Sequence, residues 1–217
     1  MLTPLEIEAL SLSLKVALWA VACSLLPGIA IAWLLARREF PGKALLDGIV
    51  HLPLVLPPVA LGYVLLVLFG RNGPVGAWLH DWFGIHMVFS WRGAALAAAV
   101  MAFPLLVRAV RLSMEAVDRR LETAARTLGA RPFRVFLTIT LPLTAPGILT
   151  GVLLAVTRCL GEFGATITFA ANVPGETRTL PLALYAALQI PGGEAGATRL
   201  ALISVALAII ALVASQD

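Results

Sequence analysis

Five long apolar runs dominate the sequence, and they constrain its fold more than any other feature. They cover about residues 10–36, 49–69, 93–110, 143–161 and 200–214. A hydrocarbon core about 30 Å thick needs about 20 helical residues to cross it. Inside lipid, backbone groups must find their hydrogen-bond partners within the chain, which only helices and closed barrels allow. The runs predict an all-α integral membrane protein, with residues 1–217 forming one polytopic bundle of about five transmembrane helices.

The composition agrees with this class. Hydrophobic residues make up 60% of the chain and charged residues only 13%, and the mean hydropathy is +0.94, far from an average soluble domain. The net charge of +4 and the pI of about 9.7 come from basic residues tied to the loops between runs. That distribution is typical of membrane topology rather than of nucleic-acid binding. Membrane lipid is an expected partner, and nucleic acid is not.

The first and last runs depart from a simple span. Residues 10–36 are longer than one crossing needs and hold a single charge, Lys15, while Pro27 followed by Gly28 predicts a bend. The last run, 200–214, is short for a crossing and ends abruptly before a polar tail, which suggests a truncated or replaced end. Residues 1–10 lack the basic start and cleavage site of a secretory signal.

Prolines and tryptophans mark the middle of the chain. The run 49–69 contains Pro53, Pro57 and Pro58, a density that a membrane helix tolerates only where neighbours or water satisfy the freed carbonyls. We expect this run to line protein or a cavity. Residues 70–92, with three tryptophans, are interpreted as an interfacial loop. Residues 179–190 are too short to span and predict a short re-entrant or surface-lying helix on the extracytoplasmic side.

Basic residues predict the orientation. The segments 37–47 and 108–134 together hold ten of the 16 lysines and arginines. By the positive-inside rule they face the cytoplasm, so five spans would leave the N-terminus outside and the C-terminus inside.

The polar interval 113–142 carries strong helix signals. Ser113 is a candidate N-cap, and Gly129 with Pro132 predicts a stop, so we expect a helix of about four turns between them. Its two faces are an apolar one and a row of alternating charges. The apolar face is Val117, Leu121, Ala124 and Leu128, and the charged row is Glu115, Arg119, Glu122 and Arg126. The small residues near its end would let another protein approach the backbone closely.

This interval resembles the EAA loop of ABC importer membrane subunits. Two alanines, three residues, a glycine, nine residues and I-x-L-P follow in the family's register, with the acid one place earlier than usual and Thr123 in its position. The matching residues are Glu122, Ala124, Ala125, Gly129, Ile139, Leu141 and Pro142. The resemblance implies a type I ABC importer fold in which 113–142 is the cytoplasmic coupling loop, its helix seated on an ATP-hydrolysing subunit. A plain surface helix is the alternative.

A second polar group lies near the end of the fourth run. Arg158, Glu162, Thr166 and Thr168 fall within one stretch at membrane depth, where ionisable groups are expensive and often functional. Hydroxyls and helix ends could line a path for an anion, and Glu162 could act as a gate. It could equally pair with Arg158 at i,i+4 and serve only the structure.

The stretch from LGEFGATITF through PGETRTLPLALY to PGGEAGATRL resembles the molybdate-type branch of these permeases. The resemblance implies a homodimer in the bacterial or archaeal cytoplasmic membrane that imports molybdate, with tungstate and sulfate left open. It also implies two ATP-binding subunits and an extracytoplasmic oxyanion-binding protein as partners. ATP and magnesium would sit on the ATPase subunit, with no cofactor on this chain.

The sequence contains few residues in patterns that are typical of catalytic or metal sites. Gly42 and Lys43 lack the rest of a phosphate-binding loop, so we expect neither ATP binding nor enzyme activity. No metal site is expected, because His80 and His86 have no third ligand in the pattern and the two cysteines, Cys23 and Cys159, stand alone in apolar runs. Two other functions remain open: an ion-coupled secondary transporter with Glu162 as proton carrier, and a membrane scaffold that holds partner subunits.

Overall fold

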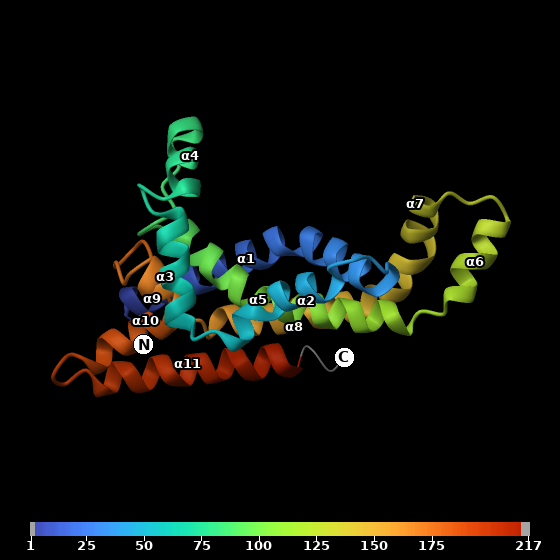
Figure 1. Ribbon diagram of the computed structural model, residues 1–217. Helices are drawn as coiled ribbons and strands as arrows, with labels where there is room; N and C mark the ends of the chain where they lie inside the picture. The colour runs from blue at the N-terminus through green and yellow to red at the C-terminus, as the bar shows by residue number, and fades with distance from the viewer. Residues whose placement is uncertain (1–2, 214–217) are drawn as a thin grey trace.

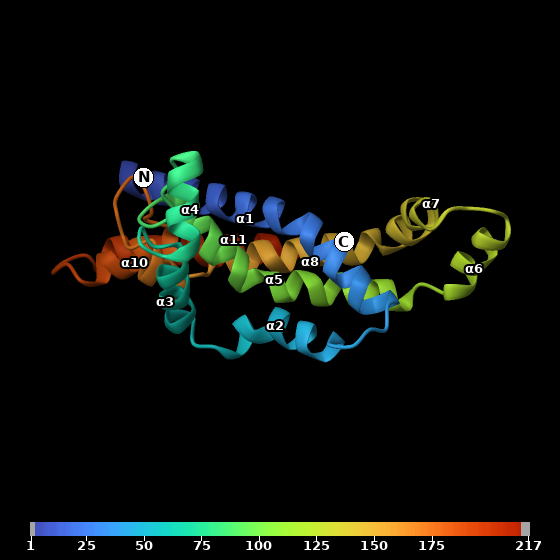
Figure 2. The same cartoon turned by 45° about the horizontal axis from the view of Figure 1, so that its top comes forward.

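The computed structural model describes residues 3–213, and every regular element in that range is a helix. Three long helices form the centre: α1 (Pro4–Arg37), α5 (Trp91–Ala116) and α8 (Leu141–Leu160). They lie side by side along the molecule, with α5 packed against both others (Figures 1 and 2). The expected all-α bundle is confirmed. Helix α1 runs through Pro27 without a break.

Small residues allow the central helices to pack closely. The buried face of α5 is rich in alanine, and the main core cluster joins it to α1 and α8. A Cβ added to Gly28 of α1 would lie 2.9 Å from Leu106 of α5, and one added to Gly147 of α8 would lie 2.1 Å from Cβ of Ser113. In lipid, helices are not driven together by the hydrophobic effect. Small side chains instead let the backbones approach closely, so that van der Waals packing holds the helices together. Ser113 is an interior residue of α5, which continues to Ala116. The prediction that Ser113 caps the start of a new helix is therefore wrong.

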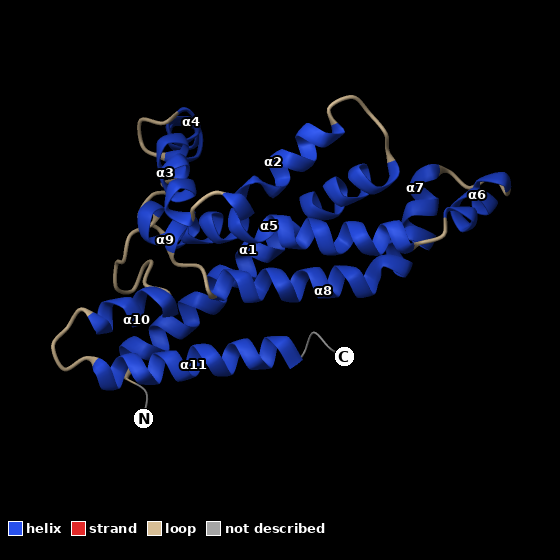
Figure 3. Ribbon diagram, turned by 60° about the horizontal axis from the view of Figure 1, so that its bottom comes forward, coloured by secondary structure: helices blue, strands red, loops and turns tan. Residues whose placement is uncertain are grey.

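The second apolar run is not one straight helix. It contains α2 (Lys43–Val55) and α3 (Pro58–Phe69), which meet at 116°. Leu56 before the proline pair is extended, at φ −71° and ψ 141°, because the ring of the next proline disfavours helical geometry there. Figure 3 shows α2 beside the central helices and α3 turning away from it. Helix α3 packs on α9 (Gly164–Phe169), where Gly62 leaves room for the carbonyl of Ala165.

The remaining short helices lie at the two ends of the bundle (Figure 1). At one end, the segment interpreted as an interfacial loop contains α4 (Pro74–Phe83), so that interpretation is wrong over those residues. Near it lies α10 (Leu180–Leu188), the expected short helix. At the opposite end α6 (Arg119–Thr127), α7 (Pro132–Val135) and the π-helical η1 (Phe136–Thr140) lead into α8.

Four helical stretches are long and apolar enough to cross a membrane, and the count is five if the bent α2 and α3 pair is one broken span. The last is α11 (Glu194–Val213), which begins before the predicted run and is therefore not short. The polar tail from Ser215 to Asp217 lies outside the described residues.

Candidate functional site

Helix α6 stands apart from the bundle, at the end formed by the polar interval (Figure 1). Its N-cap is Asp118, whose carboxylate accepts a hydrogen bond from the amide of Arg120 at 2.9 Å. It ends at Thr127, and Gly129 follows with φ +85° in the left-handed region that favours glycine. The predicted stop at Gly129 is confirmed. The helix itself is shorter than predicted, because α5 takes the residues up to Ala116.

Glu122 holds α6 to the bundle. Its Oε1 lies 2.8 Å from Nη2 of Arg37, the last residue of α1, and also accepts the hydroxyl of Thr140 at 2.8 Å. Arg126 lies 3.7 Å from the other carboxylate oxygen. Both members of the Arg37 and Glu122 pair are buried, with side-chain exposures of 6% and 9%.

Two further hydrogen bonds join the same elements. Arg37 donates to the carbonyl of Val117 at 3.3 Å, and Arg119 donates to the carbonyl of Ala36 at 3.0 Å. The connection thus uses one side chain from the end of α1, Arg37, and one from α6, Arg119. A force applied to α6 would reach α1 directly.

The two predicted faces of α6 point in different directions. Glu122, from the predicted row of alternating charges, is its one buried residue, and Thr123 beside it is exposed. Of the predicted apolar face, Val117 is buried, but Ala124 is exposed and Leu121 and Leu128 are 49% and 89% exposed. The buried ion pair decides the rotation, because a paired carboxylate finds its partners only on the bundle side. The apolar side chains consequently point away from this chain.

This exposed face continues into α7. Phe133 is 72% exposed, Ala125 half-buried and Gly129 exposed, with nothing within 4 Å of a Cβ added at that glycine. We call Leu121, Ala124, Leu128 and Phe133 the apolar tip. Exposed apolar groups that lie together mark contact surfaces. Gly129 is required here by its backbone conformation rather than by crowding within the chain.

The second half of the motif forms the joint between α7 and α8. Ile139 and Leu141 are half-buried and Pro142 is exposed. Proline has no amide hydrogen, so it cannot continue the normal helical ladder at this point. Immediately before it the backbone is π-helical, with the amide of Leu141 bonded to the carbonyl of Phe136. This wider turn leaves Thr140 buried and bonded to Glu122, so the two halves of the motif meet through one hydrogen bond.

The group around Glu162 lies at the other end of α8. Glu162 is 2% exposed, and its Oε2 lies 2.6 Å from Nη1 of Arg158, which confirms the predicted i,i+4 pair. Its Oε1 accepts the amide of Ala165 at 2.8 Å, at the start of α9. Arg158 keeps 26% of its side chain exposed. The carboxylate is therefore satisfied, while the guanidinium still reaches the surface.

The two threonines differ. Thr166 is 1% exposed, and Thr168 is half-buried and donates its hydroxyl to the carbonyl of Gly164 at 2.9 Å. Among the described residues, Thr166 is thus buried, whereas Thr168 is only partly covered. The structure thus brings the four residues into one short segment, but Thr166 points into the protein.

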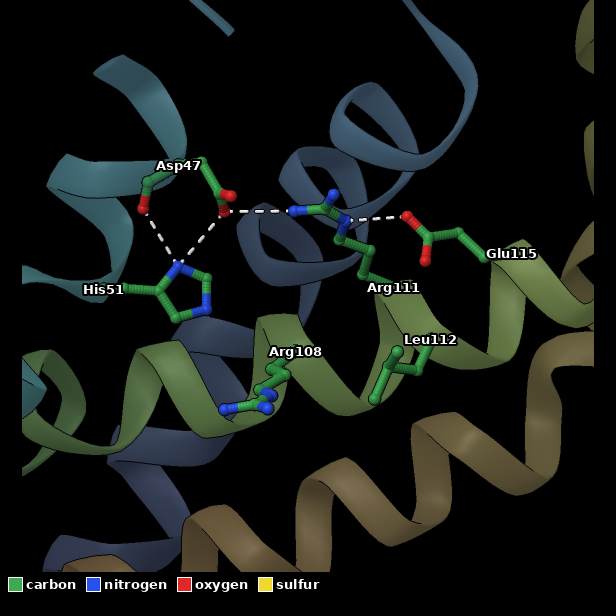
Figure 4. Close-up of a pocket in the computed structure, with 6 residues that line it drawn as sticks. All are labelled: Asp47, His51, Arg108, Arg111, Leu112 and Glu115. Atoms are coloured by element: carbon green, nitrogen blue, oxygen red, sulfur yellow. Dashed lines mark hydrogen bonds and ion pairs between the residues drawn. The ribbon is translucent and has the colours of Figure 1, made fainter. Parts of the chain in front are cut away.

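A polar cluster that the sequence did not reveal joins α2 to α5 (Figure 4). Arg111 lies 3.1 Å from Asp47 and 2.8 Å from Glu115, and Asp47 also lies 3.2 Å from His51. With Arg108 and Leu112 these residues line a cavity of about 270 Å³. The i,i+4 pairs on each helix are visible in the sequence. The contact between helices depends on the tertiary fold.

The other sequence candidates do not form a metal centre. The rings of His80 and His86 lie 4.4 Å apart, but within residues 3–213 no group of three or more possible ligands is placed to hold an ion. Cys159 is buried, whereas Cys23 is exposed.

Comparison with known proteins agrees with this arrangement. Residues 28–216 match the family described as binding-protein-dependent transport system inner membrane component. The chain is 64% identical over 215 residues to the molybdenum transport system permease protein ModB of Escherichia coli, covering 99% of this chain and 94% of that one. It is 36% identical over 212 residues to the sulfate transport system permease protein CysW of a Synechocystis species, covering 96% and 76%.

A solved structure shares the fold. The bacterial alginate ABC transporter, in complex with a periplasmic protein bound to an alginate pentasaccharide, matches with a TM-score of 0.75 at 17% identity, over 99% of this chain and 77% of that one. The type I ABC importer fold expected from the sequence is thereby confirmed. The family match and the ModB relative together show that this chain belongs to the binding-protein-dependent transport system inner membrane components, the multi-pass membrane subunits of ABC importers.

Proposed function

We propose that this chain is the permease subunit of an ATP-driven importer that carries molybdate, or a related oxyanion such as tungstate or sulfate, across the cytoplasmic membrane. The names of its molybdenum and sulfate transport relatives support this substrate class. The observation that carries the ATP-driven mechanism is the apolar tip of α6, held outward by the buried pair of Arg37 and Glu122.

The apolar tip supports docking of a separate ATP-hydrolysing subunit, which would hold the ATP and magnesium. Leu128 is 89% exposed, and leaving such a side chain in water is unfavourable unless a partner covers it. The EAA-like residues Ala124, Ala125 and Gly129 are small enough for close approach. When the ATPase subunits close, α6 would move and pull α1 through Arg37. Ile139, Leu141 and Pro142 would transmit the same motion to α8.

The assembly is proposed to contain two copies of this permease, two ATP-binding subunits and an extracytoplasmic oxyanion-binding protein. The alginate transporter complex, which shares the fold, was solved with a periplasmic protein. The basic loops around α6 favour a cytoplasmic position for this end and an outside N-terminus. The membrane is proposed to be a bacterial or archaeal cytoplasmic membrane.

The path for the anion is proposed to pass the segment from Arg158 to Thr168. A dianion needs hydrogen-bond donors and positive charge rather than carboxylates. Arg158 offers both, because Glu162 occupies one side of its guanidinium and a quarter of the side chain stays exposed. Glu162 would then orient Arg158, with Thr166 and Thr168 as further hydroxyls if α9 shifts during transport.

The test is the variant Leu128→Asp. A charge placed in the apolar tip should weaken retention of the ATPase subunit during copurification by about tenfold or more, because the carboxylate would have to be buried without a partner. Leu188→Asp is the matched control, since Leu188 is 63% exposed and lies at the end of the bundle away from α6. Molybdate uptake into vesicles holding the binding protein, with ATP inside, is measured on the same samples.

Loss of both retention and ATP-driven uptake in Leu128→Asp alone supports the proposal. Equal retention by both variants would overturn the docking role of α6. Uptake that continues without nucleotide would instead favour an ion-coupled secondary transporter, and ATP-dependent uptake of another solute but not of an oxyanion would overturn the substrate class.

A further inference from the structure

Two exposed cations share one indole at the end of the bundle away from α6. Nζ of Lys15 in α1 lies 3.9 Å from the ring centroid of Trp91, and Cζ of Arg92 lies 5.8 Å from the same centroid. Trp19, one turn after Lys15, packs against Trp91 with centroids 6.0 Å apart. Lys15 is the single charge of the first apolar run, and the proposed transport mechanism does not use it.

Among the described residues these cations have no acidic partner. None of the ion pairs formed among residues 3–213 includes Lys15 or Arg92. The nearest carboxylate on the same face of α1 belongs to Glu8, seven residues or about 10 Å along the helix. Both basic side chains are exposed. The cluster therefore presents positive charge that only indole rings accompany, an arrangement that attracts an anion from outside the chain.

The cluster lies at the depth of a membrane surface. At the other end of α1, Cζ of Arg38 lies 5.5 Å from the ring centroid of Trp33. Lys15 and Arg38 are 23 residues apart, about 34 Å along a helix, which matches a hydrocarbon core about 30 Å thick with one basic group just outside each face. Tryptophan beside lysine or arginine is typical of such interfaces. Trp19 and Trp91 thus mark one lipid boundary, and Trp33 marks the other.

An apolar surface begins directly below the cluster. Leu18 and Leu26, one and three turns from Lys15 toward the membrane centre, are 63% and 78% exposed, and Trp19 is 54% exposed. No part of the described chain covers these side chains. Acyl chains could lie along this face while their headgroup meets the cations.

We propose that Lys15, Arg92, Trp19 and Trp91 form a binding site for the phosphate headgroup of an anionic phospholipid. The phosphate lies beside the ammonium and guanidinium groups, and the acyl chains follow Leu18 and Leu26. Depth and the adjoining apolar face favour a lipid over a soluble anion, which would not contact the leucines. The two cations beside that face favour an anionic headgroup over a protein. In the proposed orientation the site belongs to the outer leaflet.

The test is native mass spectrometry of the purified permease released from nanodiscs of phosphatidylglycerol mixed with phosphatidylcholine. Wild type should retain phosphatidylglycerol in preference to phosphatidylcholine. In Lys15→Gln combined with Arg92→Gln that retention should fall about tenfold or more, since each basic group near a membrane surface contributes substantially to anionic lipid binding. Arg71→Gln removes another exposed arginine, outside the cluster and without an ion pair among the described residues, and should leave retention unchanged.

The charge-preserving pair Lys15→Arg with Arg92→Lys should retain the lipid, which separates loss of charge from a failure to fold. Equal phosphatidylglycerol retention by wild type and the Gln variant would overturn the proposal. So would displacement of the lipid by millimolar inorganic phosphate, which would indicate a soluble-anion site. Unchanged phosphatidylglycerol retention by the Gln variant in the mixed discs, together with loss of binding-protein association, would indicate a protein contact instead.

Discussion

Arg37 at the end of α1 and Glu122 in α6 form a buried ion pair with 2.8 Å between Nη2 and Oε1. Thr140 donates to the same oxygen from η1, so one carboxylate joins three separate elements. Such a pair makes a rigid connection between an exposed contact helix and a membrane helix. In an importer, this is where movement of an ATPase subunit would enter the membrane domain.

Glu122→Gln should loosen this connection. Arg37 would remain buried without a countercharge, and breaking a buried pair in this way costs about 3 kcal/mol of unfolding free energy. The measurement is unfolding in mixed detergent micelles, together with ATP-driven uptake per folded molecule. Glu39→Gln is the control, because Glu39 pairs with Lys43 in solvent and its side chain is 87% exposed. Similar losses in both variants would contradict a special role for Glu122.

Gly129 supports a prediction about backbone conformation. Gly129→Ala should destabilise the α6 turn by about 1 kcal/mol, because φ +85° is strained for a residue with a Cβ. Gly129→Asn should be milder, since asparagine tolerates the left-handed region better. A Cβ here meets nothing within 4 Å among the described residues.

Protease sensitivity of the loop and retention of the ATPase subunit separate two causes for the Gly129 variants. If retention of the ATPase subunit falls equally for Gly129→Ala and Gly129→Asn while the loop stays protected from protease, then the partner needs the space that a Cβ would fill. If Ala loses more than Asn, backbone strain is the cause.

Arg158 and Glu162 should respond unequally to substitution. Arg158→Gln leaves a carboxylate that is 2% exposed without its cation, whereas Glu162→Gln leaves a cation that reaches the surface. We expect a loss of about 3 kcal/mol for the first and less for the second. The double variant should recover most of the stability but not oxyanion uptake, because it removes the proposed positive charge on the path. Recovery of uptake together with stability would show that the pair has a purely structural role.

Asp47 and Arg111 should govern how firmly α2 lies against α5. Helix α2 buries only Val50 and Pro53, so the 3.1 Å contact between Asp47 and Arg111 is a large part of its attachment. Asp47→Asn should broaden the distance distribution between spin labels on α2 and α5. Leu45 and Leu112 suit labelling because they are 69% and 58% exposed, once the exposed Cys23 is replaced.

Lys43→Gln is the matched control for Asp47→Asn. This variant also removes a charge from α2, but the partner of Lys43 is the exposed Glu39 rather than a residue of α5. It should leave the distance distribution unchanged. An unaltered distribution in Asp47→Asn would mean that apolar packing alone holds α2.

Local patterns in the sequence predicted several features that the structure confirms. The apolar runs predicted the class of fold, Gly129 the end of α6, and the i,i+4 spacing the pair of Arg158 and Glu162. Each depends on residues within a few positions of one another, or on bulk hydrophobicity. The EAA-like register also predicts which segment faces a partner, and that role stays a prediction, which Leu128→Asp tests.

By itself, then, the sequence determined that this is a helical membrane protein of the ABC importer family with a helix in its polar interval. Only the tertiary structure decided how that helix is attached to the bundle, because Glu122 pairs with Arg37, a residue far away in the chain. The same holds for the 116° turn between α2 and α3, the contact of Asp47 with Arg111, and the cations around Trp91. Helical periodicity specifies which residues share a face, but the partner that satisfies a buried charge is specified only when distant segments pack together.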